Sequence, residues 1–96
     1  MTPTESLTQV TLLTQADCGL CEHAKKVLAR VGTDHSLQVR ELSLTSEEGR
    51  SLAADAGVMC APGILLDGAP FGYGRLSERR LRRALSARTR QPTSTN

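Results

Sequence analysis

The chain has 96 residues and a formal net charge of +2, and its 39% hydrophobic content includes one Phe, one Tyr and no Trp. This length allows one domain with an aliphatic core, and three cysteines are too few for a disulfide-rich secreted scaffold. The N-terminus lacks a signal-peptide pattern and no apolar run is long enough to span a membrane, so we expect a cytoplasmic protein without membrane contact.

The first half of the chain predicts a strand, a helix and a second strand. Residues 10–13 form a β-prone apolar run, and Asp17 is expected to cap the helix that follows. Gly32 ends this helix, and residues 37–44 predict the second strand although they alternate imperfectly. The apolar residues that share one helical face, and are therefore expected to be buried, are Leu20, Ala24, Val27, Leu28 and Val31.

A second helix is expected next. Thr45-x-x-Glu48 is a capping-box pattern that predicts its start. Gly57 predicts its end, and Gly49 inside it weakens the helical pattern.

The remaining chain predicts a hairpin and a last helix. Residues 64–66 and 69–72 are the two strands, joined by a type I′ turn at Asp67-Gly68. Pro70 confines the second of these strands to a sheet edge or a strand start, and Ser77 caps the last helix. The residues expected to staple this helix or face the core are Leu76, Leu81, Ala84 and Leu85.

The expected order is β-α-β-α-β-β-α, without an internal repeat or a linker. Residues 8–88 are therefore predicted to form one domain. We expect residues 1–7 and 89–96 to be flexible tails because they are polar and terminal.

Two thiols, Cys18 and Cys21, lie where the first strand gives way to the first helix. Two intervening residues at a helix start let both sulfurs meet in a disulfide. The first sulfur then lies by the unpaired N–H groups of the helix N-terminus, whose partial positive charge favours thiolate over thiol. Cys18 is therefore the candidate nucleophile, and Cys21 the candidate resolving thiol.

Three segments match a known family in type and spacing. They are residues 14–21 (TQADCGLC) at the strand-to-helix turn, Cys60-Ala61-Pro62 before the third strand, and Asp67-Gly68 in the hairpin. Over roughly residues 8–87 the chain resembles the glutaredoxin family of the thioredoxin-fold superfamily. The resemblance implies an α/β thioredoxin fold, a four-stranded mixed sheet flanked by three helices, and the activity of a thiol-disulfide oxidoreductase.

The resemblance also implies how such a site works. The family proline that matches Pro62 is cis and lies against the dithiol, and the residue before it, Ala61 here, offers its backbone to an extended substrate. The Cys18 thiolate attacks a disulfide, a mixed disulfide forms, and Cys21 releases the product. The dithiol itself carries the electrons, so we expect no organic cofactor. The expected partners are a disulfide substrate and an unidentified reductase or low-molecular-weight thiol, and the protein is expected to be a monomer.

The chain departs from its relatives near the dithiol and after the fourth strand. Gly-Leu separates the cysteines, where dithiol glutaredoxins have Pro-Tyr and thioredoxins Gly-Pro, and the Trp that precedes the first thioredoxin cysteine is missing. Glutaredoxins hold glutathione with a Gly-Gly pair followed by acidic residues, which residues 71–76 (FGYGRL) lack. This makes glutathione binding doubtful and favours another thiol, or a protein or small-molecule disulfide. Tyr73 is expected at the rim of the groove, where it either contacts substrate or closes a turn.

The cysteines also leave a rival function open, a metal or iron-sulfur cluster carrier. A zinc site needs about four ligands. The residues that could supply them are Cys18, Cys21, Cys60 and either His23 or His35, and a cluster held between two subunits is a related alternative. Cys60 stands two residues before Pro62, where it either serves as a third redox thiol or modification site or simply packs, and we favour burial.

The C-terminal segment is strongly basic, because residues 75–96 carry seven Arg and one Glu. A run of like charge this dense can bind nucleic acid or an acidic protein. Aromatic stacking residues are absent, however, and the arginines spread around the helix. We therefore favour a solvated helix over a nucleic-acid interface.

Overall fold

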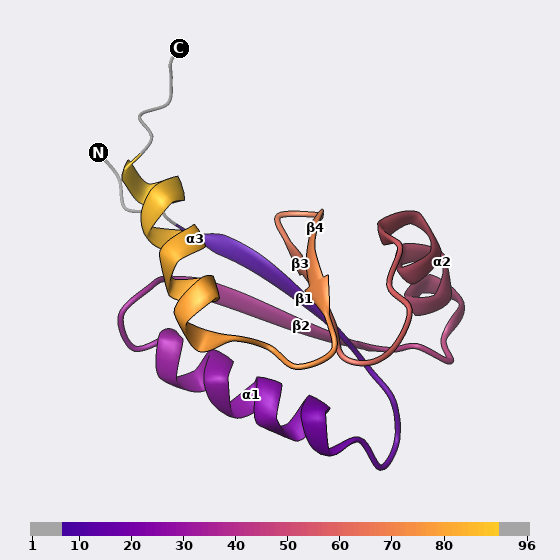
Figure 1. The fold of residues 1–96 in the computed structure, drawn as a ribbon. Coiled ribbons are helices and arrows are strands. Elements are labelled where there is room, and N and C mark those ends of the chain that lie inside the picture. The colour runs from indigo at the N-terminus through magenta and orange to yellow at the C-terminus, as the bar shows by residue number, and fades with distance from the viewer. Residues whose placement is uncertain (1–6, 91–96) are drawn as a thin grey trace.

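The computed structural model describes residues 7–90 and has the strands and helices in the predicted order (Figure 1). The elements are β1 (Thr8–Thr14), α1 (Gly19–Val31), β2 (Leu37–Ser43), α2 (Glu47–Ala56), β3 (Gly63–Leu66), β4 (Ala69–Tyr73) and α3 (Glu78–Arg90). The strand order is β2-β1-β3-β4; β1 runs parallel to β2 and antiparallel to β3, which pairs antiparallel with β4. The predicted four-stranded mixed sheet flanked by three helices is confirmed.

The sheet separates two apolar clusters of unequal size. Val10 and Leu12 of β1 belong to the larger cluster, with α1 and α3, whereas Leu13 belongs to the smaller one, with Ala53 of α2. Figure 1 shows α1 and α3 on one side of the sheet and α2 on the other. All buried members of both clusters are aliphatic and Phe71 is only partly buried, so the aliphatic core is confirmed. Because full burial of a Leu or Ile contributes about 1.5–3 kcal/mol, the larger cluster supplies most of the stabilisation.

Helix α1 begins differently from the prediction. Its N-cap is Cys18, whose backbone is extended, while Asp17 takes a left-handed φ of 53° and turns the chain just before it. Leu20, expected to be buried, is 39% exposed, because Cys21 takes the core-facing position of the first turn. The other four predicted positions of this face are buried, and Gly32 caps the C-terminus as expected.

Helix α2 starts one residue later than the capping-box pattern indicates. Ser46, not Thr45, is the N-cap, and its hydroxyl accepts a hydrogen bond from the Gly49 amide over 3.0 Å. Gly49 is buried against the end of β2, where a Cβ atom would clash with the carbonyl oxygen of Ser43. The glycine that weakens the helical pattern is thus required by packing. Gly57 ends the helix with a φ of 71°, as predicted.

The β3–β4 hairpin agrees with the sequence. Asp67 and Gly68 both have positive φ, 49° and 84°, as a type I′ turn requires. β4 is an edge strand, so Pro70 is tolerated there as predicted. The register between β3 and β4 skips Phe71, which marks a bulge in β4.

Helix α3 extends further than predicted. Ser77 caps it by accepting a hydrogen bond from the Arg80 amide, and Leu76 and Leu81 are buried in the same cluster, as a staple requires. The helix ends at Arg90, so residues 89–90 of the predicted C-terminal tail are helical. Apart from Leu7, the rest of the two predicted tails, residues 1–6 and 91–96, lies outside the described residues. None of the helices described is long and apolar enough to cross a membrane.

Glu78 joins α3 to α1 through a pair of arginines. Its carboxylate accepts hydrogen bonds from Arg30 Nη2 over 2.9 Å and from Arg82 Nε over 3.0 Å. The hydrogen bond from Arg30, followed by that from Arg82, holds the pKa of Glu78 below its ordinary value. Arg82 also pairs with Asp34 over 2.7 Å, which ties α3 to the turn after α1.

We expect Glu78→Gln to weaken the fold at neutral pH and to make its stability less sensitive to acid. The folded-state pKa lies below the unfolded value of about 4.3. Ionised Glu78 therefore stabilises the fold above that pH and loses this contribution as the pH falls through the folded pKa. Urea midpoints from about pH 7 to about pH 3 should show the wild type and the variant converging in acid. Glu47→Gln is the control, since Glu47 has no ion pair within the described residues. Identical pH profiles for the two variants would contradict the prediction.

Candidate active site

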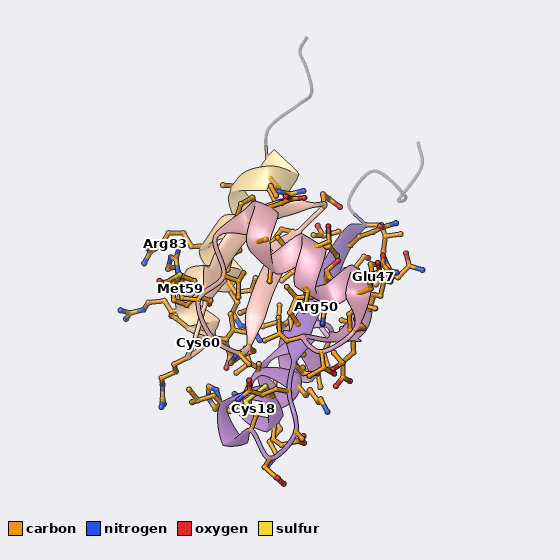
Figure 2. The ribbon with its side chains drawn as sticks, turned by 90° about the vertical axis from the view of Figure 1, so that its right-hand side faces the viewer. Cys18, Glu47, Arg50, Met59, Cys60 and Arg83 are labelled. Carbon is orange, nitrogen blue, oxygen red and sulfur yellow. A yellow bond between two sulfur atoms is a disulfide. The ribbon has the colours of Figure 1, made fainter. Side chains whose placement is uncertain are left out.

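Cys18 and Cys21 form a disulfide at the start of α1, with their Cα atoms 5.2 Å apart. A short loop connects β1 to this helix. Figure 2 shows Cys18 at the end of the molecule formed by α1 and that loop. The two residues differ in access, because Cys21 is only 2% exposed whereas Cys18 is half-buried. Cys18 is therefore the more accessible residue of the pair.

The helix N-terminus acts directly on this sulfur. The Cys21 amide donates a hydrogen bond to Cys18 Sγ over 3.0 Å. The N–H groups of the first turn and the helix dipole therefore place partial positive charge at Cys18. In the reduced protein the same arrangement favours thiolate over thiol.

The Ala61–Pro62 peptide bond is cis, as the resemblance implies. Pro62 directly precedes β3, whose first residue, Gly63, pairs with Leu13 near the end of β1. The cis bond therefore lies at the same end of the sheet as the dithiol. The Gly74 amide donates to the Pro62 carbonyl over 2.8 Å, which ties this loop to the chain after β4.

Cys60 is exposed and its thiol is free. The burial that we favoured is wrong, because Ala61 and Pro62 take the buried positions of the loop and leave Cys60 outside. A Cβ atom at Gly74 would lie 4.0 Å from Cys60 Sγ, so the thiol lies beside the loop that follows β4. Figure 2 shows Cys60 next to Met59, which is 78% exposed.

Tyr73 lies at the end of β4 and is 49% exposed. Its backbone pairs with Gly63, the residue after Pro62, and this places it at the dithiol end of the sheet. Gly74, with a φ of 82°, makes the turn toward α3. A glycine thus provides the turn geometry, and the Tyr73 side chain is left at the surface.

A comparison with protein families matches residues 9–86 to the Glutaredoxin-like domain (DUF836). The match covers most of the chain, including both bonded cysteines and the cis proline. The chain belongs to the glutaredoxin-like domain family. The comparison with curated proteins gives no match.

Solved structures share the fold of this glutaredoxin-like domain. A mutant thioredoxin from Halobacterium salinarum NRC-1 has a TM-score of 0.66 at 21% identity, over 90% of this chain and 79% of that one. A thioredoxin-like protein from Clostridium perfringens has a TM-score of 0.69 at 15% identity, over 96% of this chain and 79% of that one. These similarities confirm the α/β thioredoxin fold.

The glutaredoxin-like domain does not gather the ligands considered for zinc. Among residues 7–90, no three His, Cys, Asp or Glu side chains come together in a group that could hold a metal ion. Cys18 and Cys21 are bonded to each other, and Cys60 is separate from them. His23 has a buried Nδ1 without a hydrogen-bond partner in the described part of the chain.

The arginines near and along the last helix of the glutaredoxin-like domain fall into two groups. Three hold this helix to the rest of the domain through a backbone hydrogen bond or ion pairs: Arg80, Arg82 and Arg88. Three others are exposed, and residues 7–90 provide no hydrogen bond or ion pair for their side chains: Arg75, Arg79 and Arg83. The side chain of Arg90 is not among those described. The solvated helix that we favoured therefore describes only the second group, because the first has a structural role.

Proposed function

We propose that this glutaredoxin-like protein is a thiol-disulfide oxidoreductase that works through Cys18 and Cys21. The observation that carries the proposal is the unequal access of the two bonded residues, with Cys18 half-buried at the helix N-terminus and Cys21 buried. An attacking thiolate must be reachable by its substrate, whereas a resolving thiol has to reach only its neighbour. The pair meets both requirements.

Reduction of a substrate takes two exchange steps. The Cys18 thiolate attacks one substrate sulfur, the substrate S–S bond breaks, and the other substrate sulfur leaves as a thiolate that takes up a proton. The Cys21 thiolate then attacks Cys18 Sγ in the mixed disulfide, and the second substrate thiolate leaves. Two electrons have passed to the substrate, and the protein is in the disulfide form of this structure. A thiol donor returns it to the dithiol by the reverse exchange.

The substrate is proposed to lie along the loop before β3. The backbone of Ala61, next to the cis bond, would pair with an extended substrate, while the exposed Cys60 and Tyr73 would flank it. We favour a protein or small-molecule disulfide over glutathione, because Arg75 stands where acidic residues would be needed. The dithiol carries both electrons, so the proposed reaction needs no organic cofactor, and a reducing cytoplasm suits it.

A redox titration tests this function. The protein is equilibrated across a series of redox buffers, quenched with acid and alkylated, and intact mass counts the free thiols in each state. We expect two thiols to titrate as one reversible two-electron step that peptide mapping assigns to Cys18 and Cys21. Absence of any couple, or a need to strip metal before the thiols react, would favour the carrier function instead.

Cys60→Ser should leave the midpoint potential of this couple unmoved. Cys60 is free in the structure, so it has no bond that competes with the Cys18–Cys21 pair. The same titration checks this, with one alkylated thiol fewer in every state. A shift of about 30 mV or more, equivalent to a tenfold change in the exchange equilibrium, would instead make Cys60 a third member of the redox centre.

A further inference from the structure

Three exposed arginines without an ion pair or side-chain hydrogen bond in the described residues follow the turn at Gly74. Arg75 directly follows Gly74. The Gly74 amide donates a hydrogen bond to the Pro62 carbonyl, and a Cβ atom at Gly74 would lie 4.0 Å from Cys60 Sγ. Arg79 and Arg83 are four residues apart on α3, on the side opposite the buried Leu81 and Leu85. The remaining arginines with described side chains, apart from Arg50, form ion pairs or hydrogen bonds: Arg30, Arg40, Arg80, Arg82 and Arg88. Among the described residues, three of the five cationic side chains without a partner therefore lie between Gly74 and the second turn of α3; the other two are Lys26 and Arg50.

Exposed apolar side chains lie on the segments around the candidate active site. Leu20 stands between the two cysteines, Met59 precedes Cys60, and Tyr73 ends β4; all three are large hydrophobic residues at the surface. Figure 2 shows Arg83, Met59 and Cys60 along one side of the molecule, above Cys18. Tyr, Met and Arg are enriched in protein interfaces, where an apolar centre is bordered by polar groups. We call this set the arginine-flanked surface: Leu20, Met59, Tyr73, Arg75, Arg79 and Arg83.

We propose that the arginine-flanked surface docks a polypeptide whose reactive disulfide is bordered by acidic side chains. The inference rests on the oxidoreductase function proposed above and names its substrate class. Carboxylates of the partner would supply the counter-charges that residues 7–90 do not provide for Arg75, Arg79 and Arg83, while apolar residues of the partner cover Met59 and Tyr73. Opposite charge also steers encounter and raises association rates. The reaction is the same pair of thiol-disulfide exchanges proposed above: Cys18 attacks the peptide disulfide, Cys21 releases the product, and the protein dithiol supplies both electrons.

The test compares three synthetic peptides that carry the same internal disulfide, flanked by Glu, Gln or Lys residues. Pre-reduced protein is mixed with each peptide, and the second-order rate constant for peptide reduction is measured at low and at high salt. We expect the Glu peptide to react roughly tenfold faster than the Gln peptide at low salt and the Lys peptide to react slowest. Salt should narrow these differences, because it screens the charges.

Two double variants that remove the same charge show which arginines cause the faster reduction of the Glu peptide. Arg79→Gln/Arg83→Gln should lower the rate for the Glu peptide toward that for the Gln peptide, and should lower the rate for the Gln peptide much less. Lys26→Gln/Arg50→Gln removes the same charge from exposed positions on α1 and α2 and should change the ratio little. Circular dichroism confirms that each variant is folded.

Three results would overturn the inference. Equal rates for the three peptides with the wild type would show that acidic flanks are not recognised, while reduction of the Gln peptide would still support the oxidoreductase function. An equal loss in the control variant would assign the effect to net charge. Stronger inhibition by a DNA duplex than by polyglutamate of the same charge would assign the arginines to nucleic acid. Failure to reduce any of the peptides would count against the oxidoreductase function itself.

Discussion

Cys18→Ser should lower the rate of disulfide reduction by about 10³-fold or more, because it removes the attacking thiolate. The buried Cys21 cannot replace it, since a substrate in solution does not reach a residue that is 2% exposed. Stopped-flow mixing of pre-reduced protein with a small disulfide measures the rate constant directly. The variant should fold as the wild type does under reducing conditions, because Cys18 lies at the surface end of α1 and outside both apolar clusters.

Cys21→Ser is the matched control for the order of attack. This variant keeps the Cys18 nucleophile but lacks the thiol that releases the product, so it should accumulate a mixed disulfide through Cys18. Intact mass shows the added half of the substrate, and peptide mapping locates it. A trapped adduct on Cys21 of the Cys18→Ser protein, with none in the Cys21→Ser protein, would reverse the two roles.

Gly49→Ala should destabilise the fold by about 2–3 kcal/mol, as overpacking of a close contact does. Helix propensity alone predicts the opposite sign, since Ala is favoured over Gly inside a helix by about 1 kcal/mol. Packing decides here, because the added Cβ would clash with the Ser43 carbonyl oxygen and lie 2.9 Å from its carbon and from Ser46 Oγ. Urea unfolding under reducing conditions measures the change.

Gly19→Ala provides the comparison, since Gly19 is also helical but no atom lies within 4 Å of the Cβ it would gain. We expect its stability under reducing conditions to stay within about 0.5 kcal/mol of the wild type. Equal stability of the two variants would contradict the prediction, because it would mean that the backbone at the end of β2 shifts to accommodate the new methyl group at little cost.

Local spacing was enough to predict the cysteine pair and the hairpin, whereas the cis proline was implied by the resemblance to glutaredoxins. A C-x-x-C at a strand-to-helix turn and an Asp-Gly turn each have few structural solutions. The element order likewise followed from local signals, because β-prone apolar runs, helical spacing of apolar residues, and cap and turn residues mark each element in the sequence. These features depend on neighbours in sequence.

Features that depend on tertiary contacts were missed. Asp17 has a better side chain for capping than Cys18, but the loop after β1 turns at Asp17 and brings Cys18 to the helix start. Cys60 belongs to a residue type that is commonly buried, yet Ala61 and Pro62 fill the available space. The exposure of Leu20 could have been anticipated, because Cys21 and Leu20 cannot both face the core from one helical turn.

The unequal apolar clusters also have a consequence for motion. The dithiol stands on α1, which belongs to the larger cluster, whereas the Cys60 loop follows α2, which buries only Ala53 among its apolar side chains. Regions with few buried apolar contacts open at the lowest free-energy cost. The candidate nucleophile Cys18 is thus carried by a helix of the larger cluster, whereas the Cys60 loop follows the helix that buries fewer apolar side chains. For the proposed oxidoreductase, this difference would let the Cys60 loop adjust to substrates of different shape while Cys18 keeps its position.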